Sequence, residues 1–254
     1  MKTRSLLSLG LCRRWLAALI LSGTVLTGSV AAGRQAGTDP GIWVVNLEKS
    51  YAEIESYSAI FHKQERVDGK LREEEMISLK FKKPFKVYMK WIKAPHKGRE
   101  ALYAAGWNKN QVRVHEAGIL GLVTVNLDPN GHQAMQGNRH AITDTGLGNL
   151  VKVLRENVSK GLEAGELEFK EHGKDMVYGR KSQKIELVLP KARAKYYYCH
   201  RAVIHVDLET TVPIKVQIFD GNDLLIENYG FENLNLKAGL TDADFDPGHP
   251  AYKF

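Results

Sequence analysis

Cysteine is scarce in this chain, which has two among its 254 residues, at positions 12 and 199. Cys12 lies in an amino-terminal segment that we expect to be removed, so Cys199 has no partner for an internal disulfide. The protein must therefore be stabilised by a hydrophobic core, and about 220 residues are enough for one. A lone cysteine in a strand-rich segment is typical of a buried apolar side chain, which is the role that we assign to Cys199.

Catalytic and metal-binding motifs are also missing. The chain has nine histidines, but none stands in an HExxH motif or at another tight ligand spacing. No serine lies in a Gly-x-Ser-x-Gly turn, which excludes the commonest hydrolase nucleophile signature. The sequence therefore predicts no metal ion, no cofactor and no catalytic residue, and it favours a non-enzymatic protein.

A hydrophobic run long enough to cross a bilayer is the third absence. The apolar run Trp15–Leu21 is shorter than the roughly 20 residues that a membrane helix needs. It follows Arg13 and Arg14 and precedes small residues that end at Ala32, an arrangement typical of a secretory signal peptide. We predict a signal peptide over residues 1–32, cleavage near Ala32 and export to the periplasm. Retention of the segment as an anchor is the alternative.

Excess positive charge is mostly confined to that segment. The whole chain carries a formal charge of +7, with 36 Lys and Arg against 29 Asp and Glu. Removal of four basic residues with the signal peptide leaves 32 against 29, so the exported part carries only +3. A nucleic-acid partner loses its main electrostatic support, and we expect none.

The segment 76–115 alternates apolar and polar residues, and turn residues interrupt it. A period of two predicts strands with one buried face, and the short connections predict an antiparallel meander. Lysines occupy the other parity and are expected to face water. The acidic run Glu73–Glu75 just before this segment is interpreted as a solvated strand end, because adjacent side chains in a strand point to opposite faces.

Two amphipathic helices flank these strands. Asp39 and Pro40 are suited to open the first helix. The second is predicted from a cap at Thr143 or Thr145 to a stop at Lys160–Gly161. One helix, about five strands, a second helix and about five more strands make an antiparallel α+β plan. We expect residues 33–254 to form a single domain.

Several separated motifs are similar to those of one known family. They resemble the exported bacterial family called domain of unknown function 1571, which carries no established activity. The match extends over essentially all of the expected mature chain. The residues that carry it are Gln64–Lys70, Val87–Trp91, Lys97–Tyr103, Gly137–His140 and Gly239–Asp246.

The order of helix, meander and closing strands over residues 213–236 more distantly resembles the LolA-type periplasmic lipoprotein carriers. This resemblance implies an antiparallel meander curved into an incomplete β-barrel, a half-barrel with helices packed on its concave face. It also implies a hydrophobic ligand such as a lipid or a lipoprotein acyl chain, and envelope proteins as further partners. We expect a monomer.

The apolar face of the meander supplies the candidate walls of a ligand site. Aromatic side chains offer broad contact surfaces and methionine adapts to irregular ones. The alternative for each of these residues is an ordinary place in a filled core. The candidates are Phe81, Val87, Met89, Trp91 and Tyr103.

Arg99 and Arg139 lie just outside apolar runs, where a guanidinium could hold a ligand carboxylate or phosphate. Their alternatives are internal salt bridges, Arg99 with Glu100 or Arg139 with Asp144. His140 completes the candidate ligand-binding set. A cell-envelope hydrolase or metal-dependent enzyme centred on Asn138, Arg139 and His140 is the alternative function.

Overall fold

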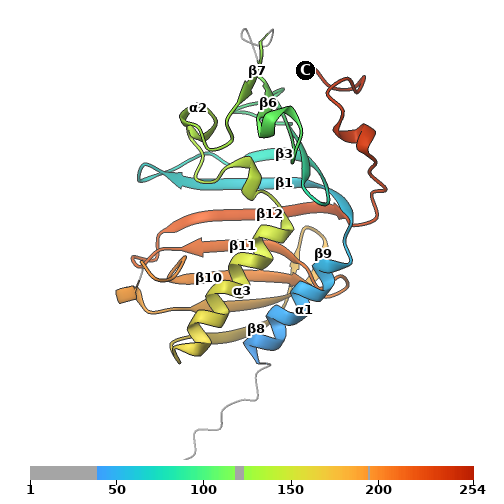
Figure 1. The fold of residues 1–254 in the computed structure, drawn as a ribbon. Helices are drawn as coiled ribbons and strands as arrows, with labels where there is room; N and C mark the ends of the chain where they lie inside the picture. The colour runs from blue at the N-terminus through green and yellow to red at the C-terminus, as the bar shows by residue number, and fades with distance from the viewer. Residues whose placement is uncertain (1–38, 118–122, 194) are drawn as a thin grey trace, which may run out of the picture. The chain divides into compact units, whose positions relative to one another are not determined.

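The alternating segments form one antiparallel sheet of twelve strands (Figure 1). The structure is a computed structural model that describes residues 39–117, 123–193 and 195–254. The predicted signal peptide of residues 1–32 lies outside the described residues. The first group of strands comprises β1 (Ser56–Val67), β2 (Lys70–Leu71), β3 (Glu75–Lys82), β4 (Lys86–Trp91), β5 (Glu100–Ala104), β6 (Val112–His115) and β7 (Thr124–Leu127). The second group comprises β8 (Glu168–Val177), β9 (Arg180–Val188), β10 (Arg201–Asp207), β11 (Pro213–Phe219) and β12 (Leu225–Asn235).

The two groups meet where β1 pairs with β12. The strand order is β7-β6-β5-β4-β3-β1-β12-β11-β10-β9-β8, with the short β2 paired to β1 beside this path. Each group is a meander, and β7 and β8 lie at opposite ends of the order, so the sheet stays open. Asp68 and Gly69 both have positive φ in the turn between β1 and β2, as the predicted hairpin requires.

Two helices cover the face of the sheet over the second group of strands (Figure 1). The helices are α1 (Pro40–Ala52) and α3 (Leu147–Glu163), which lie side by side. Leu47 and Leu154 from these helices pack into a core with Ile204 and Val216 of the strands. An open antiparallel sheet with helices on its concave face confirms the expected α+β half-barrel architecture.

The prediction of the α3 boundaries was wrong at both ends. Thr143 lies in the 3₁₀ turn η3 (Ile142–Asp144), and Gly146 is the N-cap of α3, with φ of 111°. That φ is readily adopted only by glycine, and the Tyr57 hydroxyl of β1 accepts a hydrogen bond from the Leu147 N–H at 3.0 Å. The cap therefore comes from a distant strand, and the helix runs past Lys160–Gly161 to Glu163.

The lysines of the other parity are not simply solvated. The carboxy-terminal segment crosses the opposite face of β4 and β5, where Tyr252 stacks on Tyr88 with ring centroids 3.8 Å apart. Lys80 Nζ lies 2.9 Å from Asp244 of this segment, and Lys86 Nζ lies 2.8 Å from Asp242. The lysines on this face of the sheet therefore hold the carboxy-terminal segment in place through ion pairs.

Among the described residues, no helix combines the length and the apolar character needed to span a bilayer.

Candidate ligand cavity

A cavity of about 790 Å³ lies over the first group of strands and extends onto β12 and β11. Its floor is the concave face of β1, β3–β7, β11 and β12. The segment of residues 129–146, which includes the short helix α2 (His132–Met135), covers it together with α3. The size falls within the range of ligand pockets, about 300–1,000 Å³. The apolar side chains that line it include Phe61, Met89, Trp91, Val112, Val114, Leu127, Ile142, Leu150, Tyr229 and Phe231.

Glu65 is the first of several charged residues in this otherwise apolar floor. Its side chain is 2% exposed, and one oxygen accepts a 2.5 Å hydrogen bond from the Tyr229 hydroxyl. The other oxygen accepts the Arg139 backbone N–H at 2.8 Å. Burial raises the pKa of Tyr229, so this hydroxyl remains a donor. A buried carboxylate needs such partners, because an unpaired one costs several kcal/mol.

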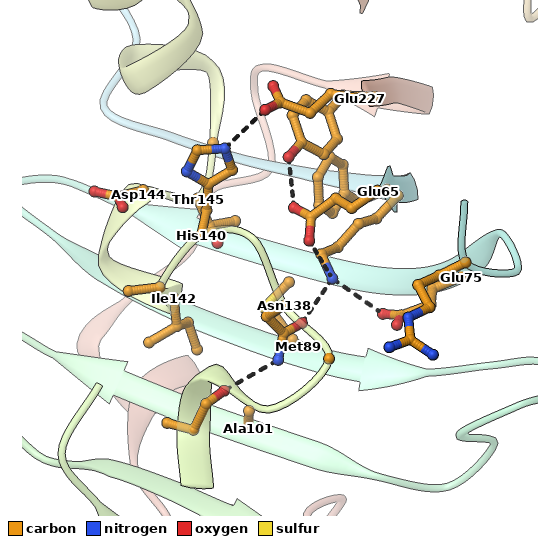
Figure 2. A pocket seen from close by; sticks show the side chains of 18 of the residues that line it. Glu65, Glu75, Met89, Ala101, Asn138, His140, Ile142, Asp144, Thr145 and Glu227 are labelled. Carbon is orange, nitrogen blue, oxygen red and sulfur yellow. Dashed lines mark hydrogen bonds and ion pairs between the residues drawn. The ribbon is translucent and has the colours of Figure 1, made fainter. Parts of the chain in front are cut away.

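Lys63 lies at the centre of the floor, where Figure 2 shows Glu65, Glu75 and Asn138 turned toward one point. Its Nζ donates to Asn138 Oδ1 at 2.7 Å and lies 3.3 Å from Glu65 and 3.7 Å from Glu75. Glu75 also accepts the Trp91 Nε1–H at 2.8 Å. A chain of ion pairs and hydrogen bonds therefore runs across β1, β3 and β4 beneath the cavity.

Glu227 forms a second buried group on β12. Its Oε1 lies 2.6 Å from Arg139 Nε, 3.0 Å from His140 Nε2 and 2.5 Å from the Tyr198 hydroxyl. Burial would raise the pKa of Glu227, but the hydrogen bond and charge of His140, aided by Tyr198 and Arg139, lower it. Burial would lower the pKa of His140, but the contact with Glu227 raises it. The pair is thus stabilised in its ionised form.

Three consecutive residues of the covering segment hold it to the floor. The Asn138 side chain binds Lys63, the Arg139 N–H binds Glu65, and the His140 ring binds Glu227. Gly137, with φ of 76°, turns the chain just before them. The segment is therefore positioned by polar contacts rather than by a packed apolar stripe.

The structure divides the eight predicted ligand-binding residues into two sets. Met89, Trp91, Arg99 and His140 line the cavity. The other four do not: Phe81 stacks on Tyr57 and Val87 is fully buried in the core, Tyr103 packs edge-on to Phe85, and the Arg139 guanidinium pairs with Glu227.

Both arginines form internal salt bridges, as in the alternative interpretation, but with other partners than the two suggested from the sequence. Arg99 Nη2 lies 2.9 Å from Glu116, not beside Glu100, and Arg139 pairs with Glu227 rather than with Asp144. The reason is geometric: Glu100 points to the opposite face of β5, where it is fully buried and pairs with Lys90.

Glu75 corrects the expectation of a solvated acidic strand end. Its side chain is buried and bonded to Trp91, whereas Glu73 and Glu74 remain exposed. Glu75 has the parity of Ile77 and Leu79 in β3, so alternation alone assigns it to the buried face.

The charged residues that sequence reasoning missed share one available signal. Lys63 and Glu65 continue the parity of Phe61 in β1, and Glu227 has the parity of Tyr229 in β12. A charged residue at a buried strand position needs a partner, so several of them predict a polar site inside the half-barrel.

The cysteine thiol and the possible metal ligands were the remaining candidates for reactive chemistry. Burial raises the pKa of the Cys199 thiol to about 12, which leaves it protonated and unreactive. In the part of the chain that the structure describes, no three His, Cys, Asp or Glu side chains are grouped to hold a metal ion.

Comparisons with known proteins identify the family, and among the solved structures the match to MucB supports the fold. MucB, also solved as the Pseudomonas aeruginosa MucA/MucB complex, is 14% identical with a TM-score of 0.50. The match covers 84% of this chain and 64% of MucB. The Mycobacterium tuberculosis lipoprotein LppX is 10% identical with a TM-score of 0.46, over 77% of this chain and 94% of LppX. A LolA superfamily protein from Nitrosomonas europaea is 8% identical with a TM-score of 0.34, over 83% and 98%.

No curated protein matches this chain. The family described as "Protein of unknown function (DUF1571)" matches residues 54–254, a range that includes every strand and the whole cavity floor. The chain belongs to the DUF1571 family.

Proposed function

We propose that this protein is an exported, non-enzymatic binder or carrier of a lipid-like ligand, which it holds in the cavity of the half-barrel. The observation that carries the proposal is the cavity of about 790 Å³ between the sheet and the segment 129–146. Helices fill the same face of the sheet over β8–β10, so the opening is confined to the remaining strands.

The lining suits a ligand with one apolar and one polar end. Phe61, Met89, Val114 and Phe231 provide apolar surface, and the Lys63–Glu65 group provides polar contacts on the floor. An acyl chain of about fifteen carbons gains roughly 12 kcal/mol on leaving water, at ~0.8 kcal/mol per CH₂. A lipid that crosses an aqueous compartment therefore requires a cover of this kind.

The setting of this function follows from the expected export. We propose that residues 33–254 are the mature domain in the periplasm, after cleavage near Ala32, and that it acts as a monomer. A lipoprotein acyl chain is one candidate ligand. MucB has been solved in complex with MucA, and an envelope protein partner is proposed here on that analogy of fold.

The contacts of His140 argue against the hydrolase alternative. Its Nε2 is occupied by Glu227 Oε1 at 3.0 Å and by the Tyr198 hydroxyl at 2.8 Å, so this ring nitrogen is engaged within the protein rather than directed at a substrate. Burial, then the charge of Glu227, raises the pKa of the Tyr198 hydroxyl beside it. The group thus contains neither an activated nucleophile nor a free base, and the binding role is favoured.

The first test is recovery of a ligand. Protein purified without detergent from the periplasm is extracted with organic solvent, and the extract is analysed by mass spectrometry. A lipid at close to one equivalent is expected. Absence of any lipid, together with no binding of a neutral fluorescent probe, would overturn the proposal.

A blocked cavity provides the matched control. Ala134 lines the cavity from α2, and Ala134→Trp is expected to lower probe affinity at least about tenfold, because the indole occupies ligand space. Ala164 is exposed at the end of α3, so Ala164→Trp adds the same side chain outside the cavity and should bind normally. Equal binding by both variants would place the ligand elsewhere.

A further inference from the structure

The volume of the cavity limits the size of the lipid that it can hold. An apolar cavity of about 150 Å³ binds benzene, which gives ~25 Å³ for each carbon atom. An oleoyl chain of about 18 carbons then needs ~450 Å³, whereas the cavity provides about 790 Å³. Two such chains need ~900 Å³ before the groups that join them are counted. The cavity therefore has room for one long chain and not for two.

Part of this volume borders charged groups rather than hydrocarbon. Lys63 of β1 and Glu75 of β3 line the floor between the apolar residues of β4–β6 and those of β11 and β12. Their side chains are each 12% exposed, and Lys63 Nζ lies 3.7 Å from the Glu75 carboxylate. A hydrocarbon placed against them displaces water from charged groups and replaces none of its hydrogen bonds. The space that suits a chain is thus smaller than the whole cavity.

The cavity cannot widen without breaking contacts between the covering segment and the floor. Residues 138–140 of that segment contact the floor at Lys63, Glu65 and Glu227 (Figure 2). The Glu65 and Glu227 side chains are each only 2% exposed. If the segment rises to admit a second chain, these two carboxylates lose partners and face hydrocarbon, which is strongly unfavourable for a buried charge.

The carboxyl end of the covering segment is fixed by close packing. The Tyr57 hydroxyl accepts the Leu147 N–H at 3.0 Å, and a Cβ at Gly146 would lie 2.5 Å from the same hydroxyl. Tyr57 and Leu147 are both fully buried. The segment is therefore held in its middle and at its end, and the volume beneath it is set by the fold.

We propose that the cavity holds a lipid with one long acyl or alkyl chain and excludes lipids with two long chains. This inference rests on the proposed function and names the class of its ligand. Fatty acids, fatty alcohols and lysophospholipids belong to this class. Long-chain diacyl phospholipids do not, whatever their headgroup, because volume rather than charge sets the limit.

The test compares two lipids that differ only in the second chain. Oleoyl lysophosphatidylcholine and dioleoyl phosphatidylcholine are each delivered by methyl-α-cyclodextrin to the protein after bound lipid has been removed. Gel filtration then separates the donor, and mass spectrometry of an organic extract measures the lipid bound per protein. Close to one equivalent of the lysolipid is expected. At least about tenfold less of the dioleoyl lipid is expected, because its second chain stays in water.

A shorter two-chain lipid separates volume from the number of chains. Dinonanoyl phosphatidylcholine has the headgroup and glycerol of the dioleoyl lipid, but its two chains together have about 18 carbons and need ~450 Å³. It should load to within about threefold of the lysolipid. Exclusion of this lipid as well would mean that the branched glycerol is rejected rather than the volume, and it would overturn the inference.

Two asparagine variants test whether the covering segment sets the limit. Asn138→Ala removes the contact of this segment with Lys63, and Lys63 keeps Glu65 and Glu75 as charged partners. It should raise dioleoyl loading at least about threefold. Asn149→Ala removes the same side chain from the lining on α3. This control enlarges the cavity without releasing the segment, so it should keep the wild-type selectivity.

The outcomes separate this inference from the proposed function. A difference of less than about tenfold between the lysolipid and the dioleoyl lipid would overturn the one-chain limit and leave the lipid-binding function intact. Equal dioleoyl loading by Asn138→Ala and wild type would overturn the role of the covering segment in setting that limit. Failure of all three lipids and of the neutral fluorescent probe to bind would overturn the binding function and this inference together.

Discussion

The two halves of the sheet use the same concave face in different ways. Over β8–β10 the helices α1 and α3 fill it, and Leu47, Ile204 and Val206 are at most 1% exposed. Over β1, β3–β7, β11 and β12 the covering segment 129–146 leaves a cavity of about 790 Å³. Both halves are antiparallel meanders, so strand topology is not what separates them.

The difference lies in the residues at the buried strand positions. Lys63, Glu65, Glu75 and Glu227 all lie at the floor of the cavity, where each has polar or charged partners. A helix with an apolar stripe could not cover them without leaving charges unpaired, at a cost of several kcal/mol. A polar segment can cover them, but it does not fill the space. The charged residues at buried positions of the floor therefore also explain why a cavity is left above it.

The largest effect should come from paired leucine truncations. Leu47 of α1 is 1% exposed in the filled half, and Leu150 of α3 is partly buried beside the cavity. Leu47→Ala should lower the free energy of unfolding by about 2–5 kcal/mol because it creates a void. Leu150→Ala should cost about half as much or less, since its side chain already borders empty space. Urea denaturation measures both.

This pair tests whether the two halves differ in packing. Both substitutions place alanine in a helix, so helix propensity cancels. Equal losses of unfolding free energy would mean that the wall at Leu150 is packed as tightly as the core at Leu47.

Replacing a small buried side chain with a larger one should separate the two halves by the size of the stability loss. Ala202 of β10 and Ala101 of β5 are 2% and 3% exposed, but only Ala101 lines the cavity. Ala202→Leu should cost about 1–3 kcal/mol by overpacking. Ala101→Leu should change stability by less than about 1 kcal/mol, because the added methyl groups enter free volume. A loss at Ala101 as large as at Ala202 would contradict the comparison.

A smaller effect should depend on pH. His140→Gln keeps a hydrogen-bond donor for Glu227 but removes the charge, and should cost about 1 kcal/mol where the ion pair is formed. Because the pKa of His140 is raised above 6.5, its contribution is complete below that pH and is lost as the pH rises through the folded-state value.

Glu227 sets the lower limit of the pH range in which the ion pair contributes to stability. Its pKa is lowered below 4.5, so its contribution is present above 4.5 and is lost as the pH falls through the folded-state value. The difference in unfolding free energy between wild type and His140→Gln should thus be largest near about pH 5.5. His132→Gln, at an exposed position of α2, is the control, and a pH-independent difference would refute the ion-pair assignment.

Much of the fold could be predicted because alternation is a local signal. The parity of Ile77, Leu79, Met89 and Trp91 assigns these residues to the buried face, and all four are buried. The same rule applied to Lys63, Glu65 and Glu75 would have predicted a polar site on that face. At these positions the charge of the side chain predicts exposure and its parity predicts burial, and the structure follows the parity.

The partners of the arginines could not be predicted from nearby sequence. Arg139 and Glu227 are 88 positions apart, and they meet because β12 pairs with β1 while the segment 138–140 lies over both. The cap of α3 has the same origin, since Tyr57 reaches Leu147 across 90 positions. Contacts of this kind depend on the strand order, which periodicity does not determine.

The pairing of β1 with β12 also constrains how the chain acquires its structure. Phe61 aligns with Phe231 and Glu65 with Glu227, so the centre of the sheet joins the first strand to the last. Closing so long a loop is entropically costly and makes folding slow relative to proteins with local contacts. The cavity floor contains residues from both strands, and the segment that ends at β7 lacks one of its two buried acid groups. The floor is therefore completed only when β12, near the end of the chain, has been made.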